Sequence, residues 1–253
     1  MLRRVRAVGW IVGVAAVLAV GAAPARAENA CAIPDDMNAS ASDLAARVAA
    51  CTSAADADPH DARARLTLGR LQERRRDFAA AEAALSSAIA IDQTLAAAWA
   101  ERCNARLMQQ KLGDAADDCT RAIGLGSQDA GPYFARGQIR VLTSDFAGGR
   151  ADLDRAIAKA PNHAPLLDYW RAKADYGLHL WPDTVTDITR YIAGVADDPD
   201  AYRLRAAALI NQHQVPASLA DLKRAKDLYF NRGDLQRANS MESLIQRFSA
   251  PPS

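Results

Sequence analysis

Histidines and clustered acidic residues are the side chains of this sequence that could bind a metal or act as acids and bases. Both kinds of chemistry need several such side chains to converge on one site. The four histidines lie at least 34 residues apart, except for one pair that is 16 apart (His60, His163, His179 and His213). The acidic cluster at Asp114, Asp117 and Asp118 lacks the ligand order and the central glycine of a calcium loop.

Motifs of common enzyme classes are also missing. The sequence contains no GxSxG, HExxH, GxGxxG or CxxCH, and the glycine-rich segment 124–131 lacks the lysine and the preceding strand of a phosphate loop. A formal net charge of +1 offers no general attraction to nucleic acid. We therefore expect a protein that is not an enzyme, with no metal, no cofactor and no nucleic-acid partner.

The N-terminus has the pattern of a secretory signal peptide. Three arginines lie within residues 3–6, an apolar run covers 7–23, and residues 25–27 form a small–x–small end, which predicts a signal peptide over 1–27 with cleavage after Ala27. An uncleaved anchor is the alternative, although the apolar run is short for a membrane span. The residues before Cys31 lack the small, apolar run of a lipid-attachment site, and the Arg3-Arg4 pair alone does not make a twin-arginine signal.

Removal of this segment would leave a mildly acidic, soluble chain. It takes away four arginines and no acid, which leaves 27 basic and 30 acidic residues and a net charge of −3. We expect this exported protein to reside in a bacterial periplasm. Hydrophobic residues make up 50% of the whole chain but aromatic residues only 6%, and the abundance of alanine favours closely packed helices.

A repeat of 34 residues organises most of the remaining chain. The units span 62–95, 96–129, 130–164, 165–198 and 199–232, and the fourth carries Pro182 and Tyr191 at positions that predict a distorted unit. In the third unit the repeated positions are Tyr133, Gly137, Phe146, Gly149, Leu153, Ala156 and Pro161, and in the first they are Gly69, Phe78, Ala81, Leu85 and Ala88. This spacing resembles the tetratricopeptide repeat, whose pattern W-x2-L-G-x2-Y…A-x3-F…P is matched by Trp99, Leu68, Gly69, Ala81, Leu85, Ala88 and Pro161.

The resemblance implies an all-α fold, a right-handed superhelix (α-solenoid) of about five helical hairpins. Small residues such as Gly137 and Gly149 let the two helices of a unit approach closely, and Asp145 can cap the second helix. Each hairpin buries its apolar side only against the next one. Residues 28–61 are expected to form an N-terminal segment and a half-repeat, 233–248 a capping helix, and 249–253 a flexible tail. The capping helix would turn inward Leu235, Ala238, Met241, Leu244, Ile245 and Phe248.

The four cysteines are compatible with two disulfides in an oxidising compartment, and three connectivities are possible. Cys103 and Cys119 are equidistant from Lys111, beside the expected turn, so they can meet within one hairpin. Cys31 and Cys51 would then join the N-terminal segment to the first helix. The alternative is that Cys103 and Cys119 are small, buried thiols.

The resemblance also implies a binding surface, because the first helix of each unit lines the concave groove in proteins of this family. The groove positions in family register are Arg63, Leu66, Arg70, Glu73 and Arg74; Asn104, Leu107 and Met108; Phe134, Gln138, Val141 and Leu142; Tyr169, Lys173 and Tyr176; and Arg203, Ile210 and Asn211. A basic end followed by an apolar, aromatic middle suits an amphipathic helix or a peptide with an acidic end.

The favoured function is therefore a periplasmic, non-catalytic adaptor that binds a protein or peptide partner, of unknown identity, in this groove. Two other hypotheses remain open. One is an enzyme or small-ligand carrier with a site between helices, and the other is a membrane-tethered organiser of the envelope that retains its signal segment.

Overall fold

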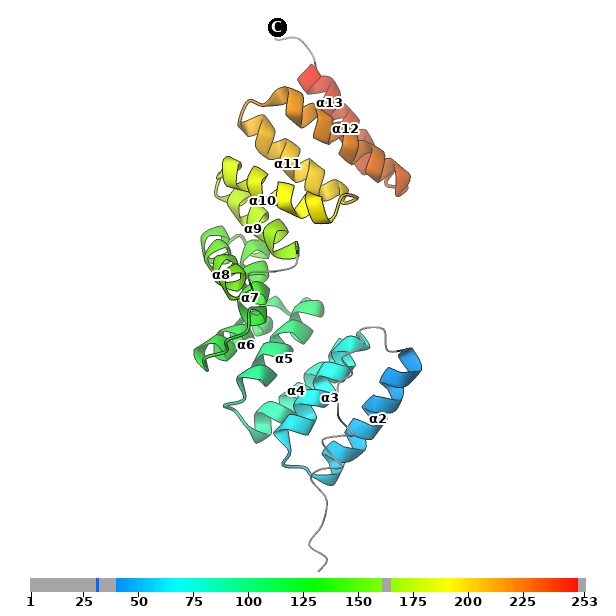
Figure 1. Ribbon diagram of the computed structural model, residues 1–253, viewed down its shortest axis with the longest axis vertical. Coiled ribbons are helices and arrows are strands. Elements are labelled where there is room, and N and C mark those ends of the chain that lie inside the picture. Colours follow the sequence, from blue (N-terminus) through cyan, green and yellow to red (C-terminus); the bar gives the residue numbers. More distant parts are fainter. Residues whose placement is uncertain (1–30, 32–39, 161–164, 250–253) are drawn as a thin grey trace, which may run out of the picture.

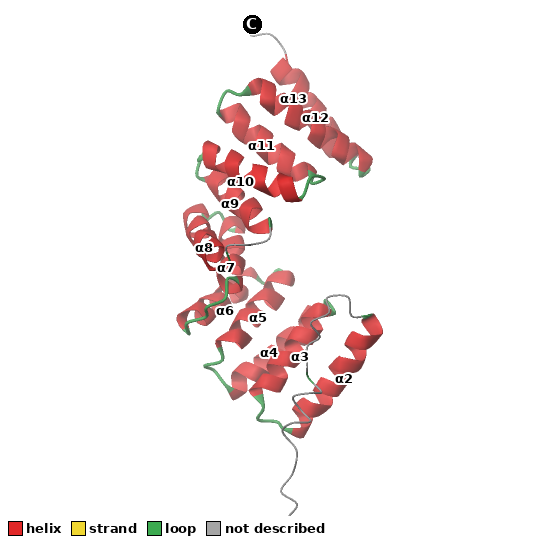
Figure 2. Ribbon diagram, in the orientation of Figure 1, coloured by secondary structure: helices red, strands yellow, loops and turns green. Residues whose placement is uncertain are grey.

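The computed structural model describes residues 31, 40–160 and 165–249, and all regular elements within these ranges are α-helices (Figures 1 and 2). They are α2 (Ala41–Ala57), α3 (Ala62–Arg74), α4 (Phe78–Ile91), α5 (Ala96–Met108), α6 (Leu112–Gly124), α7 (Gly131–Leu142), α8 (Phe146–Lys159), α9 (Leu166–Gly177), α10 (Trp181–Gly194), α11 (Pro199–Asn211), α12 (Val215–Asn231) and α13 (Leu235–Ser249). None of these helices is long and apolar enough to cross a membrane. The expected signal peptide, Pro161, His163 and residues 250–253 lie outside the described residues.

Successive helices pack as hairpins that stack along the long axis of the molecule, from α2 at one end to α13 at the other (Figure 1). Each helix packs chiefly against the helices before and after it in the chain, as expected for a repeat array in which units contact only their neighbours. The predicted all-α solenoid of helical hairpins is confirmed.

The same tight turn closes each hairpin from α3–α4 to α11–α12. One residue per turn adopts a left-handed backbone with φ between 59° and 66°, at Arg76, Gln110, Ser144, His179 and His213. The next residue donates its amide to the carbonyl five positions earlier, as Asp145 does to Arg140 at 2.8 Å. The α12–α13 turn has the same geometry, with Gly233 at φ 76°. This geometry ends a helix and reverses the chain within a few residues.

Helix capping and close packing follow the sequence pattern. The Asp145 side chain accepts a hydrogen bond from the amide of Gly148 and caps α8, as predicted. In the same hairpin, a Cβ atom on Gly137 would lie 2.9 Å from Cγ of Leu153 and 3.3 Å from the carbonyl oxygen of Gly149. The two helices can therefore approach this closely only with glycine at the crossing.

The fourth unit is regular in its described part, so the predicted distortion is wrong. Pro182 lies in the first turn of α10, where its missing amide hydrogen breaks no helical bond. The Tyr191 side chain is buried, packs on Tyr169 with ring centres 4.9 Å apart, and donates its hydroxyl hydrogen to Asp198 at 2.9 Å. A large residue is therefore accommodated where the repeat pattern has a small one.

The two ends of the array are covered by α2 and α13. Helix α2 packs on α3 and buries Cys51 and Ala55. Helix α13 packs on α12 and buries Ala238, Met241 and Ile245, as predicted. Leu235 does not turn inward, because it begins α13 directly after the turn and remains 55% exposed.

Both predicted disulfides are present. Cys103 on α5 is bonded to Cys119 on α6, with Cα atoms 5.3 Å apart, and both residues are fully buried. Cys31 is bonded to Cys51 of α2, with Cα atoms 4.6 Å apart. The structure therefore selects one of the three connectivities and rejects the alternative of free buried thiols.

Candidate protein-binding face

The first helices of the five units form one continuous face of the array. Helices α3, α5, α7, α9 and α11 each contact the next in this series, in addition to the second helix of their own unit. Pairs of second helices, such as α4 and α6, make no comparable contact. The array therefore curves toward its first helices, and we call the surface that they present the inner face.

The predicted groove residues differ in how much of each residue is exposed to solvent. Seven are exposed on the first helices, namely Arg63, Arg74, Asn104, Met108, Leu142, Arg203 and Asn211. Eight are half-buried, namely Arg70, Glu73, Phe134, Gln138, Tyr169, Lys173, Tyr176 and Ile210. Leu66, Leu107 and Val141 are buried and contribute to the packing between helices, so we remove them from the proposed binding surface.

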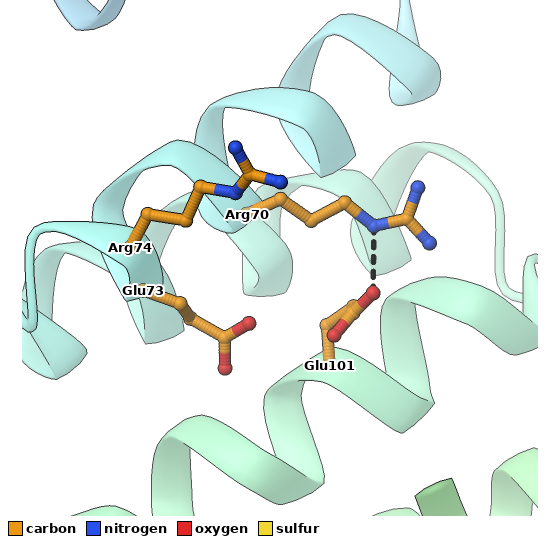
Figure 3. Close-up of a pocket in the computed structure, with 4 residues that line it drawn as sticks. All are labelled: Arg70, Glu73, Arg74 and Glu101. Atoms are coloured by element: carbon orange, nitrogen blue, oxygen red, sulfur yellow. Dashed lines mark hydrogen bonds and ion pairs between the residues drawn. The ribbon is translucent and has the colours of Figure 1, made fainter. Parts of the chain in front are cut away.

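The N-terminal part of the inner face contains an open pocket of about 510 Å³ between α3 and α5. Its lining residues are Arg70, Glu73 and Arg74 of α3 and Glu101 of α5 (Figure 3). The Arg70 guanidinium donates from Nε to Oε1 of Glu101 at 2.6 Å, and Asn104 donates from Nδ2 to Oε1 of Glu73 at 3.0 Å. Two arginines and two glutamates therefore meet across the junction of two units.

The two carboxyl groups of this pocket affect each other. Figure 3 shows the Glu73 carboxyl group pointing toward Glu101, whose own carboxylate is held by Arg70. Burial and the Glu101 charge raise the pKa of Glu73 to about 8, against the opposing effects of the Asn104 hydrogen bond and the Arg70 charge. Glu73 is therefore mostly protonated at neutral pH.

An aromatic cluster lies in the middle of the inner face. Phe134 of α7 and Trp170 of α9 pack on one small core, and Tyr169 contacts Trp170 edge-on, with ring centres 6.0 Å apart. The Lys173 ammonium lies 4.2 Å from the centre of the Trp170 ring and 5.6 Å from that of Tyr169. Burial lowers the pKa of Lys173, and burial raises that of Tyr169 to about 12.

Arg203 belongs to a polar cluster at the C-terminal end of the inner face. Its guanidinium forms an ion pair with Asp200 at 3.3 Å, and the Tyr229 hydroxyl donates to the same carboxylate at 2.7 Å. Arg237 of α13 also approaches Asp200, at 3.8 Å. Arg203 is a predicted groove residue, whereas its partners were not predicted from the sequence.

A ladder of arginine–aspartate pairs, which was not predicted from the sequence, joins the two helices of the hairpins that carry this face. The aspartates are buried, and the arginines are buried or half-buried. In units two to five an arginine of the first helix forms two hydrogen bonds with an aspartate of the second helix. The distances are 2.6 to 2.9 Å, and the pairs are Arg102–Asp118, Arg136–Asp152, Arg171–Asp187 and Arg205–Asp221.

Each of these arginines also reaches back to the preceding unit. Arg136 donates to the Thr120 hydroxyl at 3.1 Å, and the corresponding acceptors of the other three arginines are Ser86, Asp154 and Thr189. One guanidinium therefore links the two helices of its own hairpin and also connects that hairpin to the preceding one. These pairs could have been predicted from the sequence, because they recur about once per repeat and the arginine and aspartate are always 16 residues apart.

Comparison with known proteins identifies the fold. No family model matches the sequence, and no curated protein sequence matches it. The crystal structure of YrrB, a tetratricopeptide repeat (TPR) protein with an unusual peptide-binding site, superposes with a TM-score of 0.66 at 16% identity, covering 78% of this chain and 99% of YrrB. The chain has the tetratricopeptide-repeat fold.

Two further solved structures superpose on most of the chain. The pilF protein of Pseudomonas aeruginosa superposes with a TM-score of 0.65 at 13% identity, covering 79% of this chain and 90% of that protein. PilW, a widely conserved type IV pilus biogenesis factor, gives a TM-score of 0.55 at 16% identity, covering 74% and 92%. At these levels of identity, the similarities show a shared fold.

Proposed function

We propose that this TPR chain is a non-catalytic scaffold that binds a protein segment along its inner face. The observation that carries the proposal is the arrangement of the first helices, which places side chains from five consecutive units on one continuous surface. That surface changes from charged residues on α3 to apolar and aromatic residues on α7 and α9. A solved TPR structure of the same fold, YrrB, has a peptide-binding site.

Two exposed apolar residues make the proposal testable without disturbing the core. Met108 ends α5 and is 47% exposed, and Leu142 ends α7 and is 50% exposed. They lie one repeat apart, at equivalent positions of units two and three. Their repetition at equivalent positions of two neighbouring units of the inner face offers apolar contacts to a segment that lies along that face.

The experiment is a crosslinking pull-down from an extract of the source cells. We expect Met108→Asp combined with Leu142→Asp to lose the partner that the unmodified protein recovers, since each change places a charge in an apolar contact. The matched control is Leu235→Asp, which introduces the same charge at a residue that is 55% exposed at the start of α13. Equal recovery by the inner-face variant and the control would refute the inner face as the binding surface.

We further propose that the protein works in the periplasm. The proposal is supported by the signal-peptide pattern of residues 1–27 and by the two disulfides, which persist in an oxidising compartment. N-terminal sequencing of the protein from a periplasmic extract should begin at Glu28. Recovery of the intact N-terminus in the membrane fraction would instead favour a retained anchor.

A further inference from the structure

The four side chains that line the pocket between α3 and α5 allow its net charge to depend on protonation. Its arginines lie one turn apart on α3, and Glu73 lies between them in sequence and faces Glu101 across the unit junction (Figure 3). When both glutamates are ionised, the four side chains have no net charge. When Glu73 is protonated, the pocket carries one net positive charge and a carboxyl group that can donate a hydrogen bond.

Most ionisable groups on the neighbouring helices form ion pairs of their own, whereas Arg75, Arg76 and Asp77 in the turn after α3 are exposed to solvent. Helix α4 carries one, Glu82, which binds Arg106 and Lys111. On α5, Arg102 and Arg106 bind Asp118. On α2 the ionisable residues are Asp43, Arg47 and Asp56, and Asp56 pairs with Arg65. Within the pocket, the Glu101 charge raises the pKa of Glu73 and the Arg70 charge lowers it, and Arg74 also lines the pocket.

We propose that this pocket is a proton-linked anion site, which holds a carboxylate of the bound protein segment while Glu73 is protonated and releases that carboxylate when Glu73 is ionised. This inference rests on the proposed function, because it assigns one end of the inner face to an acidic part of the partner. The guest carboxylate would accept hydrogen bonds from the arginines and from the protonated Glu73. Ionisation of Glu73 would replace that donor by a like charge.

The expected pH dependence follows from linkage. The pKa of Glu73 is raised to about 8, so the anion-binding form predominates below this pH and is depleted above it. Affinity for an acidic guest should be nearly constant from pH 6.5 to 7.5. Above pH 8 it should fall by up to about tenfold per pH unit, because one proton is needed for each anion bound.

The test uses a defined probe and the full chain. The probe is acetyl-Glu-Leu-Glu-amide labelled with tetramethylrhodamine, and its neutral control has glutamine in place of glutamate. Dissociation constants are measured by fluorescence anisotropy between pH 6.5 and 9.5 at constant ionic strength. We expect the acidic peptide to bind more tightly than the neutral one at pH 7, with the difference largely lost at pH 9.5.

Two variants test whether the pH dependence of peptide affinity arises in this pocket. Glu73→Gln keeps a neutral side chain that can still accept from Asn104, so its affinity at pH 9.5 should stay within about twofold of its value at pH 7. Asp117→Asn changes an exposed acid of α6 and should keep the wild-type pH dependence. Circular dichroism at each pH checks that the helices remain folded.

The outcomes separate this inference from the broader function. A pH-independent affinity of the unmodified protein, or a fall in affinity that persists in Glu73→Gln, would overturn the proton-linked site even if the inner-face pull-down succeeds. The opposite result is also informative. If the peptide binds in the expected proton-linked manner but the Met108→Asp, Leu142→Asp variant still recovers every partner, the anion site is supported and the extended inner-face contact is refuted.

Discussion

The arginine–aspartate ladder predicts a large difference between breaking a pair and replacing it. Asp152 of α8 is fully buried and accepts two hydrogen bonds from Arg136, at 2.7 and 2.8 Å, and a third from Arg140 at 2.8 Å. Arg136 itself is only 8% exposed. Asp152→Ala would leave this guanidinium buried without its counter-charge.

The expected magnitude follows from the cost of an uncompensated buried charge. Removal of one partner of a buried ion pair costs about 3–5 kcal/mol of unfolding free energy. For a folded region of this size, 1 kcal/mol corresponds to roughly 2–4 °C in Tm. We therefore expect Asp152→Ala to lower the Tm by roughly 6–20 °C.

The first repeat shows which apolar residues can replace the arginine–aspartate pair. At the two positions of the pair, unit one carries Leu68 and Ala84, and these residues pack together in the core next to α2. The double variant Arg136→Leu, Asp152→Ala copies this arrangement into unit three. Because apolar replacement of a whole buried pair is often neutral or stabilising, it should recover most of the stability lost in Asp152→Ala.

Urea titration followed by circular dichroism provides the assay, and an exposed pair provides the control. Lys226 and Glu242 are also 16 residues apart and form an ion pair at 3.1 Å, but their side chains are 35% and 42% exposed. Glu242→Gln should change the unfolding free energy by less than about 1 kcal/mol. If Asp152→Ala costs no more than Glu242→Gln, the ladder does not hold the hairpins together and the reasoning is refuted.

Three further predictions concern a turn, a helix crossing and acid stability. Ser144→Gly should raise the unfolding free energy by about 0.5–1 kcal/mol in urea titration, because glycine adopts the left-handed φ of 66° without strain. Gly137→Ala should lower it by about 1–3 kcal/mol, since the new Cβ would press on Leu153; an unchanged midpoint would contradict the close approach. Burial opposes ionisation of Glu82, but hydrogen bonds from Lys111, Arg106 and Gln109 lower its pKa to about 2. Its contribution to stability should therefore be complete above about pH 4.5 and disappear as the pH falls toward 2, so Glu82→Gln should flatten this part of the stability–pH curve measured by urea titration.

The fold could be predicted from the sequence because the evidence for it is local and repeated. Each unit specifies its own hairpin through small residues at the helix crossing, such as Gly137 and Gly149, and through a capping residue such as Asp145. The Cys103–Cys119 pairing followed from the same hairpin geometry. Stacking of the units then needs no long-range information.

The binding surface was harder to predict, because exposure depends on how closely neighbouring units approach. Leu66, Leu107 and Val141 occupy groove positions of the family register, yet the packing of this array buries them. Glu101 was missed because its role arises from an ion pair with Arg70 of the preceding unit. Such contacts join residues about 30 positions apart, and no single repeat contains them.

The buried ladder was missed for a different reason. The repeat is recognised by its apolar and small positions, whereas arginine and aspartate are rarely found in the interior of a protein. Arg136 and Asp152 satisfy each other with a pair of hydrogen bonds, which allows both to lie in the interior. A search for repeated charged positions would have found them.

Site-specific photocrosslinking tests the central claim most directly. A benzoylphenylalanine side chain is placed at Met108, Leu142 or Asn211 on the inner face, or at the exposed second-helix residues Ser87, Asp117 or Arg155 as controls. We expect one partner to be crosslinked from the inner-face positions and not from the controls. Crosslinks confined to the second helices, or equal from both sets, would contradict binding at the inner face.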